Sequence, residues 1–258
     1  MINDRLRQVL VIVTTVLVFG MNVLANVLPL NGLNTGEISD RFDIFFVPAG
    51  YVFSIWFLIY AGLIAYSIYQ ALPAQREAPR LRAIAPWYVV SSVANVVWLF
   101  LWHYEVFSLT LFAMLALLFS LIMVFLLLNV GRVQVTSVEK WTVYVPFSIY
   151  LGWVTVATIA NTTQLLFYLD WNGFGIAPDV WAAIILVAGV VISALMSLSR
   201  ANVAYSLVLV WAYIGIAVKF PTVPMVTYSA WGSVAVILLV LGIGYFRNSN
   251  RKRPLKTA

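Results

Sequence analysis

Three apolar stretches of this sequence carry aromatic and amide side chains at helical spacing. Residues three, four and seven positions apart share one face of a helix, so each stretch presents a single aromatic and polar face. These faces consist of Phe53, Trp56 and Tyr60, of Ser91, Asn95, Trp98 and Trp102, and of Tyr150, Trp153, Ala157, Asn161 and Gln164. Three such faces together indicate a cavity that binds a ligand without covalent chemistry.

A second interpretation of the same residues stays open. Amides in hydrocarbon are costly unless they find partners, so they should point inward. They would also do so if they only joined helices by hydrogen bonds, with the tryptophans serving as packing or interface anchors. Asn22 and Asn26 form a further amide pair, four residues apart, in the first apolar stretch.

Residues for covalent or metal chemistry are scarce. The chain has no cysteine and one histidine, which excludes thiolate chemistry and any histidine-cluster metal site. His103 lies beside Tyr104 and Glu105 at the end of an apolar stretch, and we interpret it as an interfacial polar residue rather than a haem ligand. No paired carboxylates occur within an apolar stretch, and no glycine-rich phosphate loop is present. The sequence gives no independent support for an enzyme.

Composition places the chain in a membrane. Hydrophobic residues make up 63% of the sequence, charged residues only 9%, and the mean hydropathy is +0.98. Soluble domains carry roughly 25% charged residues. The net charge of +6 is explained by basic loops facing lipid head groups, so we expect membrane lipids as partners and no nucleic acid.

Hydropathy predicts an all-α polytopic membrane bundle of about eight transmembrane helices. The sixth and seventh spans are joined by so short a link that they must be antiparallel. The expected spans are 9–28, 49–72, 86–104, 107–129, 141–165, 179–199, 201–219 and 226–246.

Charge predicts the orientation of these spans. Nearly all basic clusters fall on one side if both termini are cytoplasmic, in a cell or inner membrane. Arg41 and Lys219 are the only cations expected on the other side. Lys219 most simply snorkels to the interface, with pairing to a ligand carboxylate as the alternative.

The connections carry further expectations. Residues 29–48 form a long outer loop without obvious structure, which is typical of a lid or a disordered segment. Residues 73–85 are expected to be a proline- and arginine-rich cytoplasmic connector. Asp179, after Pro178, is a candidate helix N-cap. Small residues in the last three spans should allow close helix packing; they are Gly189, Ser193, Ser197, Gly232, Gly242 and Gly244.

Several motifs resemble the tryptophan-rich sensory protein family, also called the translocator protein family. The segment 48–60, PAGYVFSIWFLIY, is similar to its second-helix signature, and Asn95-Val-Val-Trp98 resembles its third-helix N-x-x-W. Val145-Pro146, followed by Trp153, Ala157-Thr158 and Asn161, is similar to its fifth-helix pattern. The resemblance covers about residues 8–168. Tyr51 stands where the family usually has tryptophan, and the long outer loop has none of the tryptophan or tyrosine that the family places there.

The resemblance implies a five-helix bundle over residues 1–170, followed here by three added helices over 171–247 and a basic cytoplasmic tail over 248–258. It implies a sensor or carrier that requires no cofactor and binds a tetrapyrrole, such as protoporphyrin or haem, or a sterol-like lipid. By similarity and by helix face, the ligand-binding residues would be Phe53, Trp56, Tyr60, Asn95, Trp98, Trp153, Ala157 and Asn161. Arg41 would be the rim cation for the ligand's carboxylates.

Two other functions stay open at this point: a small-solute transporter with proline- and glycine-interrupted helices, and a membrane enzyme acting on a lipid or a tetrapyrrole. The sequence also leaves open whether two copies form a homodimer.

Overall fold

The computed structural model describes residues 3–28 and 30–251. Within them all regular secondary structure is helical. Eight long helices form the body of the protein. They are α1 (Asp4–Val27), α3 (Ile55–Ala71), α4 (Pro79–His103), α5 (Phe107–Leu127), α7 (Val145–Tyr168), α8 (Pro178–Arg200), α9 (Val203–Lys219) and α10 (Pro224–Arg251). The short elements are η1 (Leu30–Gly32), α2 (Thr35–Asp40), η2 (Gly50–Ser54), η3 (Pro73–Gln75), α6 (Ser137–Glu139), the π-turn η4 (Lys140–Tyr144) and η5 (Gly173–Gly175).

The prediction of an all-α membrane bundle is confirmed. Among the described residues, 7 helical segments are long and apolar enough to cross a membrane, and α9 is a shorter apolar helix of 17 residues. At 1.5 Å per residue α9 is about 26 Å long, close to the hydrocarbon thickness of a bilayer. Of the predicted tail over 248–258, α10 includes the residues up to Arg251, and 252–258 lie outside the described residues, as does the side chain of Asn26.

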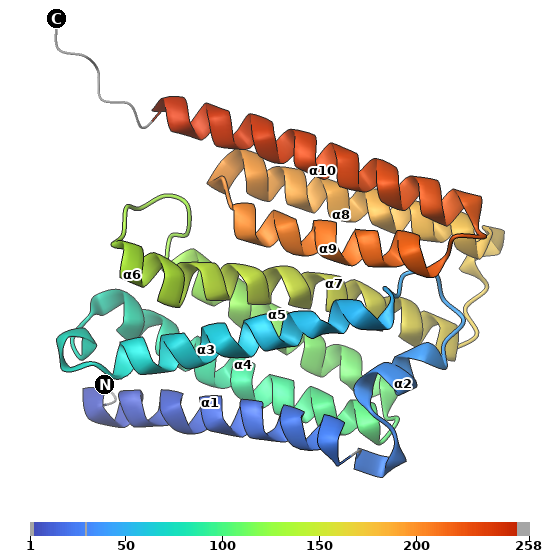
Figure 1. The fold of residues 1–258 in the computed structure, drawn as a ribbon. Helices are drawn as coiled ribbons and strands as arrows, with labels where there is room; N and C mark the ends of the chain where they lie inside the picture. Colours follow the sequence, from blue (N-terminus) through green and yellow to red (C-terminus); the bar gives the residue numbers. More distant parts are fainter. Residues whose placement is uncertain (1–2, 29, 252–258) are drawn as a thin grey trace, which may run out of the picture.

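The helices form two groups (Figure 1). Helices α1, α3, α4, α5 and α7 pack together, and α8, α9 and α10 form the second group. Helix α9 packs against α7 and joins the groups. Among the 7 candidate spans, the one that contains α7 is the most enclosed, and its buried residues include Tyr150, Trp153 and Asn161.

The start of α4 differs from the sequence prediction. Helix α4 begins at Pro79 rather than at residue 86, because proline is favoured in the first helical turn, where its missing N–H would have no partner. Its first turn therefore carries Arg80 and Arg82, which the prediction placed in a connector. Arg82 pairs with Asp4 of α1 at 2.6 Å, and Arg80 pairs with Glu139 at 3.3 Å.

The outer connection over 29–48 also differs from the prediction. It contains η1 and α2 rather than an unstructured loop. Asn34 caps α2 in a capping box: its side chain accepts from the backbone N–H of Glu37, whose carboxylate accepts from the N–H of Asn34. The N-x-x-E spacing carries this signal in the sequence.

The predicted close packing in α8–α10 holds at some positions only. A Cβ on Gly189 would lie 1.8 Å from the Tyr213 hydroxyl, and one on Gly244 would lie 2.4 Å from the carbonyl oxygen of Ser197. Nothing lies within 4 Å of a Cβ on Gly232 or Gly242, so for these two the prediction was wrong.

The predicted N-cap role of Asp179 was also wrong. Ala177 is the N-cap residue of α8, and Asp179 lies within the first turn. There its carboxylate accepts from the N–H of Val180 at 3.0 Å, which leaves an acidic group at the positive end of the helix dipole.

Candidate ligand cavity

A small enclosed space lies between α3, α4, α5 and α7, beneath α2. Its volume is about 50 Å³. Its walls are mostly apolar and aromatic, with a few polar groups. The lining residues are Thr35, Ser39, Val47, Pro48, Phe53, Trp56, Asn95, Trp98, Trp102, Met114, Leu117, Trp153, Val154, Val156, Ala157, Ala160, Asn161 and Gln164.

Most of the residues proposed from the sequence converge on this space. Those that line it are Phe53, Trp56, Asn95, Trp98, Trp153, Ala157 and Asn161. Tyr60 lies one turn beyond Trp56 and stacks on it, with ring centroids 5.3 Å apart and an interplanar angle of 16°. Arg41 does not line the cavity; its exposed guanidinium pairs with Glu105.

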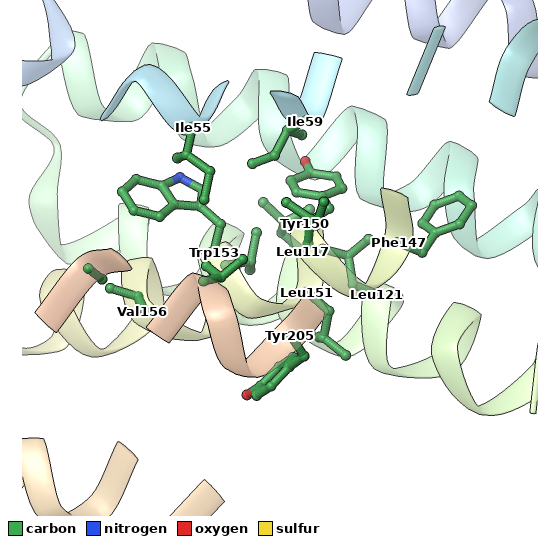
Figure 2. Packing of buried hydrophobic residues seen from close by; sticks show 14 of the residues in the cluster. Ile55, Ile59, Leu117, Leu121, Phe147, Tyr150, Leu151, Trp153, Val156 and Tyr205 are labelled. Atoms are coloured by element: carbon green, nitrogen blue, oxygen red, sulfur yellow. The ribbon is translucent and has the colours of Figure 1, made fainter. Parts of the chain in front are cut away.

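Aromatic rings from three helices form the walls. Trp153 meets Phe53 and Trp56 edge to face, with centroids 5.7 and 6.2 Å apart. On α4, Trp98 and Trp102 stack at 5.7 Å and 19°. Figure 2 shows Trp153 and Tyr150 on the side of α7 that faces Ile55 and Ile59 of α3, with Tyr205 on the other side. Edge-to-face and offset-stacked pairs are the favoured aromatic geometries, so the walls are well packed.

The buried amides are bonded to neighbouring helices. Asn22 donates from Nδ2 to Oδ1 of Asn95 at 2.9 Å, and Asn95 donates to the Tyr150 hydroxyl at 3.3 Å. The Nε1 of Trp98 donates to Oδ1 of Asn161 at 3.0 Å. The amides thus join α1, α4 and α7 by hydrogen bonds, as the second interpretation expects, and Asn95 and Asn161 also line the cavity.

Helix α2 covers the cavity, and His103 holds it in place. Thr35 and Ser39 of α2 line the space. The Nδ1 of His103 lies 3.1 Å from the carbonyl oxygen of Leu30, and its Nε2 lies 3.1 Å from Oγ1 of Thr35. The residue is 1% exposed, so the prediction of an interfacial histidine was wrong. The folded outer connection, which the sequence analysis did not foresee, covers it.

Two ion pairs fasten α2 from outside. Besides Arg41 and Glu105, Lys219 of α9 donates from Nζ to Oδ1 of Asp40 at 2.6 Å. The simplest expectation for Lys219, a free snorkelling side chain, is therefore corrected. The partner of Lys219 is Asp40 of the same chain. This ion pair links α2, which covers the cavity, to α9 in the second group of helices.

Helix α9 also fixes the turn that leads into α3. The Nε1 of Trp211 donates to the carbonyl oxygen of Val52 at 3.0 Å. The N–H of Ala49 donates to the carbonyl oxygen of Gly215 at 3.1 Å. A Cβ on Gly215 would lie 2.2 Å from Cγ2 of Val52 and 3.0 Å from Cβ of Pro48. Since Pro48 lines the cavity, the added helices position one of its walls.

Comparison with family models supplies the classification. The family described as TSPO-like protein matches residues 8–243. The chain belongs to this TSPO-like family. Comparison with curated proteins and with solved structures gives no match.

The TSPO-like match agrees with the resemblance found in the sequence and extends further. It runs beyond residue 168 through α8, α9 and most of α10. Together with the apolar helices it supports an integral membrane protein. The side chains of Thr35, Ser39, Val47, Met114 and Leu117 line the cavity without having been singled out from the sequence. They come from the cover, the turn before α3 and a uniformly apolar α5, where no polar or aromatic periodicity marked them.

Proposed function

We propose that this TSPO-like protein binds a flat hydrophobic ligand, a porphyrin-like tetrapyrrole or a sterol-like lipid, in the aromatic cavity beneath α2. The observation that carries the proposal is the convergence of Trp56, Trp98 and Trp153 from three helices on one space. Such rings stack on a macrocycle, and the membrane depth of the site suits its apolar body.

The cavity as it stands is small. Its volume of about 50 Å³ is far below the roughly 300–1,000 Å³ of sites that hold drug-sized ligands. Binding therefore requires an open state in which α2 moves away and the rings rearrange. The fastenings of α2 suit such a motion, because exposed ion pairs contribute only about 0–1 kcal/mol each.

The same motion would provide polar partners for the ligand. In the closed state Arg41 pairs with Glu105 and Lys219 pairs with Asp40. Both cations lie at the edge of the cover rather than in the cavity. When α2 moves, they become free to pair with ligand carboxylates, which is how a tetrapyrrole would differ from a neutral sterol. A sensor would stop at this binding step, and a carrier would also release the ligand elsewhere.

Titration of the detergent-purified protein with protoporphyrin tests the proposal, with tryptophan fluorescence and porphyrin absorbance as readouts. Trp98→Phe and Trp153→Phe should each weaken saturable binding by about threefold to tenfold, because an aromatic pair contributes roughly 0.5–1.5 kcal/mol. Trp231→Phe, on the exposed face of α10, is the matched control and should bind as wild type. Non-saturable quenching that is identical in all four proteins would refute tetrapyrrole binding at this site.

A further inference from the structure

A large groove lies along the start of α7, whereas the aromatic cavity lies further along the same helix, from Trp153 to Gln164. Its volume is about 1080 Å³, and it runs between the start of α3, the first half of α7 and the first half of α9. Exposed apolar side chains form its sides, among them Leu58 and Leu207, and Trp211 lies at its far end. Exposed Trp141 and Tyr245 also line it.

Two cations stand at one end of this groove. Lys140 and Arg200 both line it, and its lining contains no aspartate or glutamate. Lys140 lies over the ring of Trp141, with Nζ 5.8 Å from the centroid. Arg200 donates to the carbonyl oxygen of Val130 at 3.2 Å and lies over the Phe125 ring. Within residues 3–28 and 30–251, neither cation has a carboxylate partner.

The basic end of the groove is a fixed structure. A Cβ on Gly131, which has a φ of +78°, would lie 2.0 Å from the carbonyl oxygen of Arg200. The loop after α5 and the turn between α8 and α9 are therefore in direct contact. Nδ2 of Asn202 donates to Oγ of Ser148 at 2.9 Å and ties the second loop to α7. The cations are therefore presented by a packed surface.

The length of the groove matches one leaflet. From Val203 at the basic end to Trp211 at the apolar end, α9 rises about 12 Å. Half of a bilayer's hydrocarbon core is about 15 Å. Aromatic side chains such as Trp141 at the basic end are typical of the level of the lipid head groups.

We propose that this groove binds one anionic phospholipid, with its phosphate at Lys140 and Arg200 and an acyl chain along Leu58 and Leu207. The unpaired cations call for an anion, and the apolar sides call for a hydrocarbon chain of one leaflet's depth. The protein's own C-terminal tail is excluded as the occupant by its charge, because Lys252, Arg253 and Lys256 carry the same sign as the groove.

Native mass spectrometry of the purified protein tests this, with phosphatidylglycerol and phosphatidylcholine of matched chains as probes. Wild type should retain phosphatidylglycerol preferentially. Lys140→Gln and Arg200→Gln should each lower that retention about fivefold, as expected for one cation near a lipid head group. Arg5→Gln, an exposed cation of α1, is the matched control and should retain it fully. Arg200 also donates to the carbonyl oxygen of Val130 in the loop after α5. If Arg200→Gln is unstable for that reason, lipid retention in Lys140→Gln alone tests the proposal.

The apolar half of the groove has its own pair of variants. Leu207→Trp should obstruct the chain and lower retention, whereas Leu195→Trp, on the exposed face of α8, should not. Equal retention of the two lipids by wild type, or equal losses in Lys140→Gln and Arg5→Gln, would overturn the proposal. So would a dimer that Leu207→Trp dissociates, because a second copy would then occupy the groove. Addition of inorganic phosphate should not displace the lipid; displacement would show that the groove selects only the phosphate.

Discussion

Trp98 of α4 and Asn161 of α7 are joined by a hydrogen bond of 3.0 Å across the candidate cavity. The amide of Asn161 also donates to the carbonyl oxygen of Ala157 one turn earlier, at 3.1 Å. The orientation of the Asn161 amide is therefore set by its own helix α7. The amide in turn holds the indole of Trp98. A buried amide here both joins two helices and fixes the position of a ring that would contact the ligand.

Asn161→Leu should destabilise the protein and weaken ligand binding together. The substitution leaves the indole N–H of Trp98 unpaired at 6% exposure, and interhelical hydrogen bonds in membranes contribute about 1–2 kcal/mol. Thermal unfolding in detergent, read with porphyrin binding, measures both effects. Asn161→Leu combined with Trp98→Phe should cost less than the sum of the two single changes. Strict additivity would contradict the coupling of the two residues.

Lys219→Gln should increase the opening of α2. The change removes the ion pair with Asp40, so the population of the open state should rise up to about fivefold. Because the chain has no cysteine, Ser39→Cys places a single thiol on the buried face of α2, at a position that is 6% exposed. The rate of maleimide labelling of this thiol reports the opening. Salt should raise the rate more in the otherwise unchanged protein than in the Lys219→Gln background, where only the pair of Arg41 and Glu105 remains. An unchanged rate in Lys219→Gln would mean that its ion pair does not hold the cover.

Gly215→Leu should disturb the cavity from outside it. The new side chain would clash with Val52 and Pro48, and overpacking typically costs 1–3 kcal/mol. We expect weaker porphyrin binding and a lower unfolding temperature. Gly232→Leu is the matched control, since a Cβ there meets nothing within 4 Å and both quantities should stay at their wild-type values. Normal ligand binding in a stable Gly215→Leu protein would show that α9 does not position the wall.

The charge distribution predicts the orientation in the membrane. Single cysteines at Arg132 and Asp170, both exposed, should label on opposite sides. In intact cells an impermeant maleimide should reach Asp170→Cys, and Arg132→Cys should react only after permeabilisation. The reverse pattern would place both termini outside.

Much of the fold was predictable because hydrophobic length and loop charge are strong signals in membrane proteins. The aromatic faces of α3, α4 and α7 were also predictable, since Trp56, Trp98 and Trp153 keep helical spacing with their polar neighbours. The helix start at Pro79 was not, because a basic and proline-rich stretch is equally typical of a connector. Proline in the first helical turn and the ion pair between Arg82 and Asp4 of a distant helix favour this start.

The roles of His103, Lys219 and Arg41 could not be predicted for a related reason. Each depends on where residues 30–41 fold, and that segment is too short and polar to give a periodic signal. The sequence analysis expected no helix there, although the N-x-x-E spacing of Asn34 and Glu37 is typical of a capping box, and that spacing does not indicate that the helix covers His103. Contacts between distant segments, such as Lys219 with Asp40, are set by tertiary packing rather than by local pattern.

The most direct test of ligand binding beneath α2 is protoporphyrin affinity in Ala157→Phe. Ala157 lines the cavity, and a phenyl ring there would fill the remaining space of about 50 Å³. The matched control is Ala116→Phe, on the exposed face of α5. We predict that Ala157→Phe lowers the affinity about tenfold or more, on the scale of an overpacked site, while Ala116→Phe leaves it unchanged. Equal affinity in a correctly folded Ala157→Phe protein would contradict the assignment of the cavity.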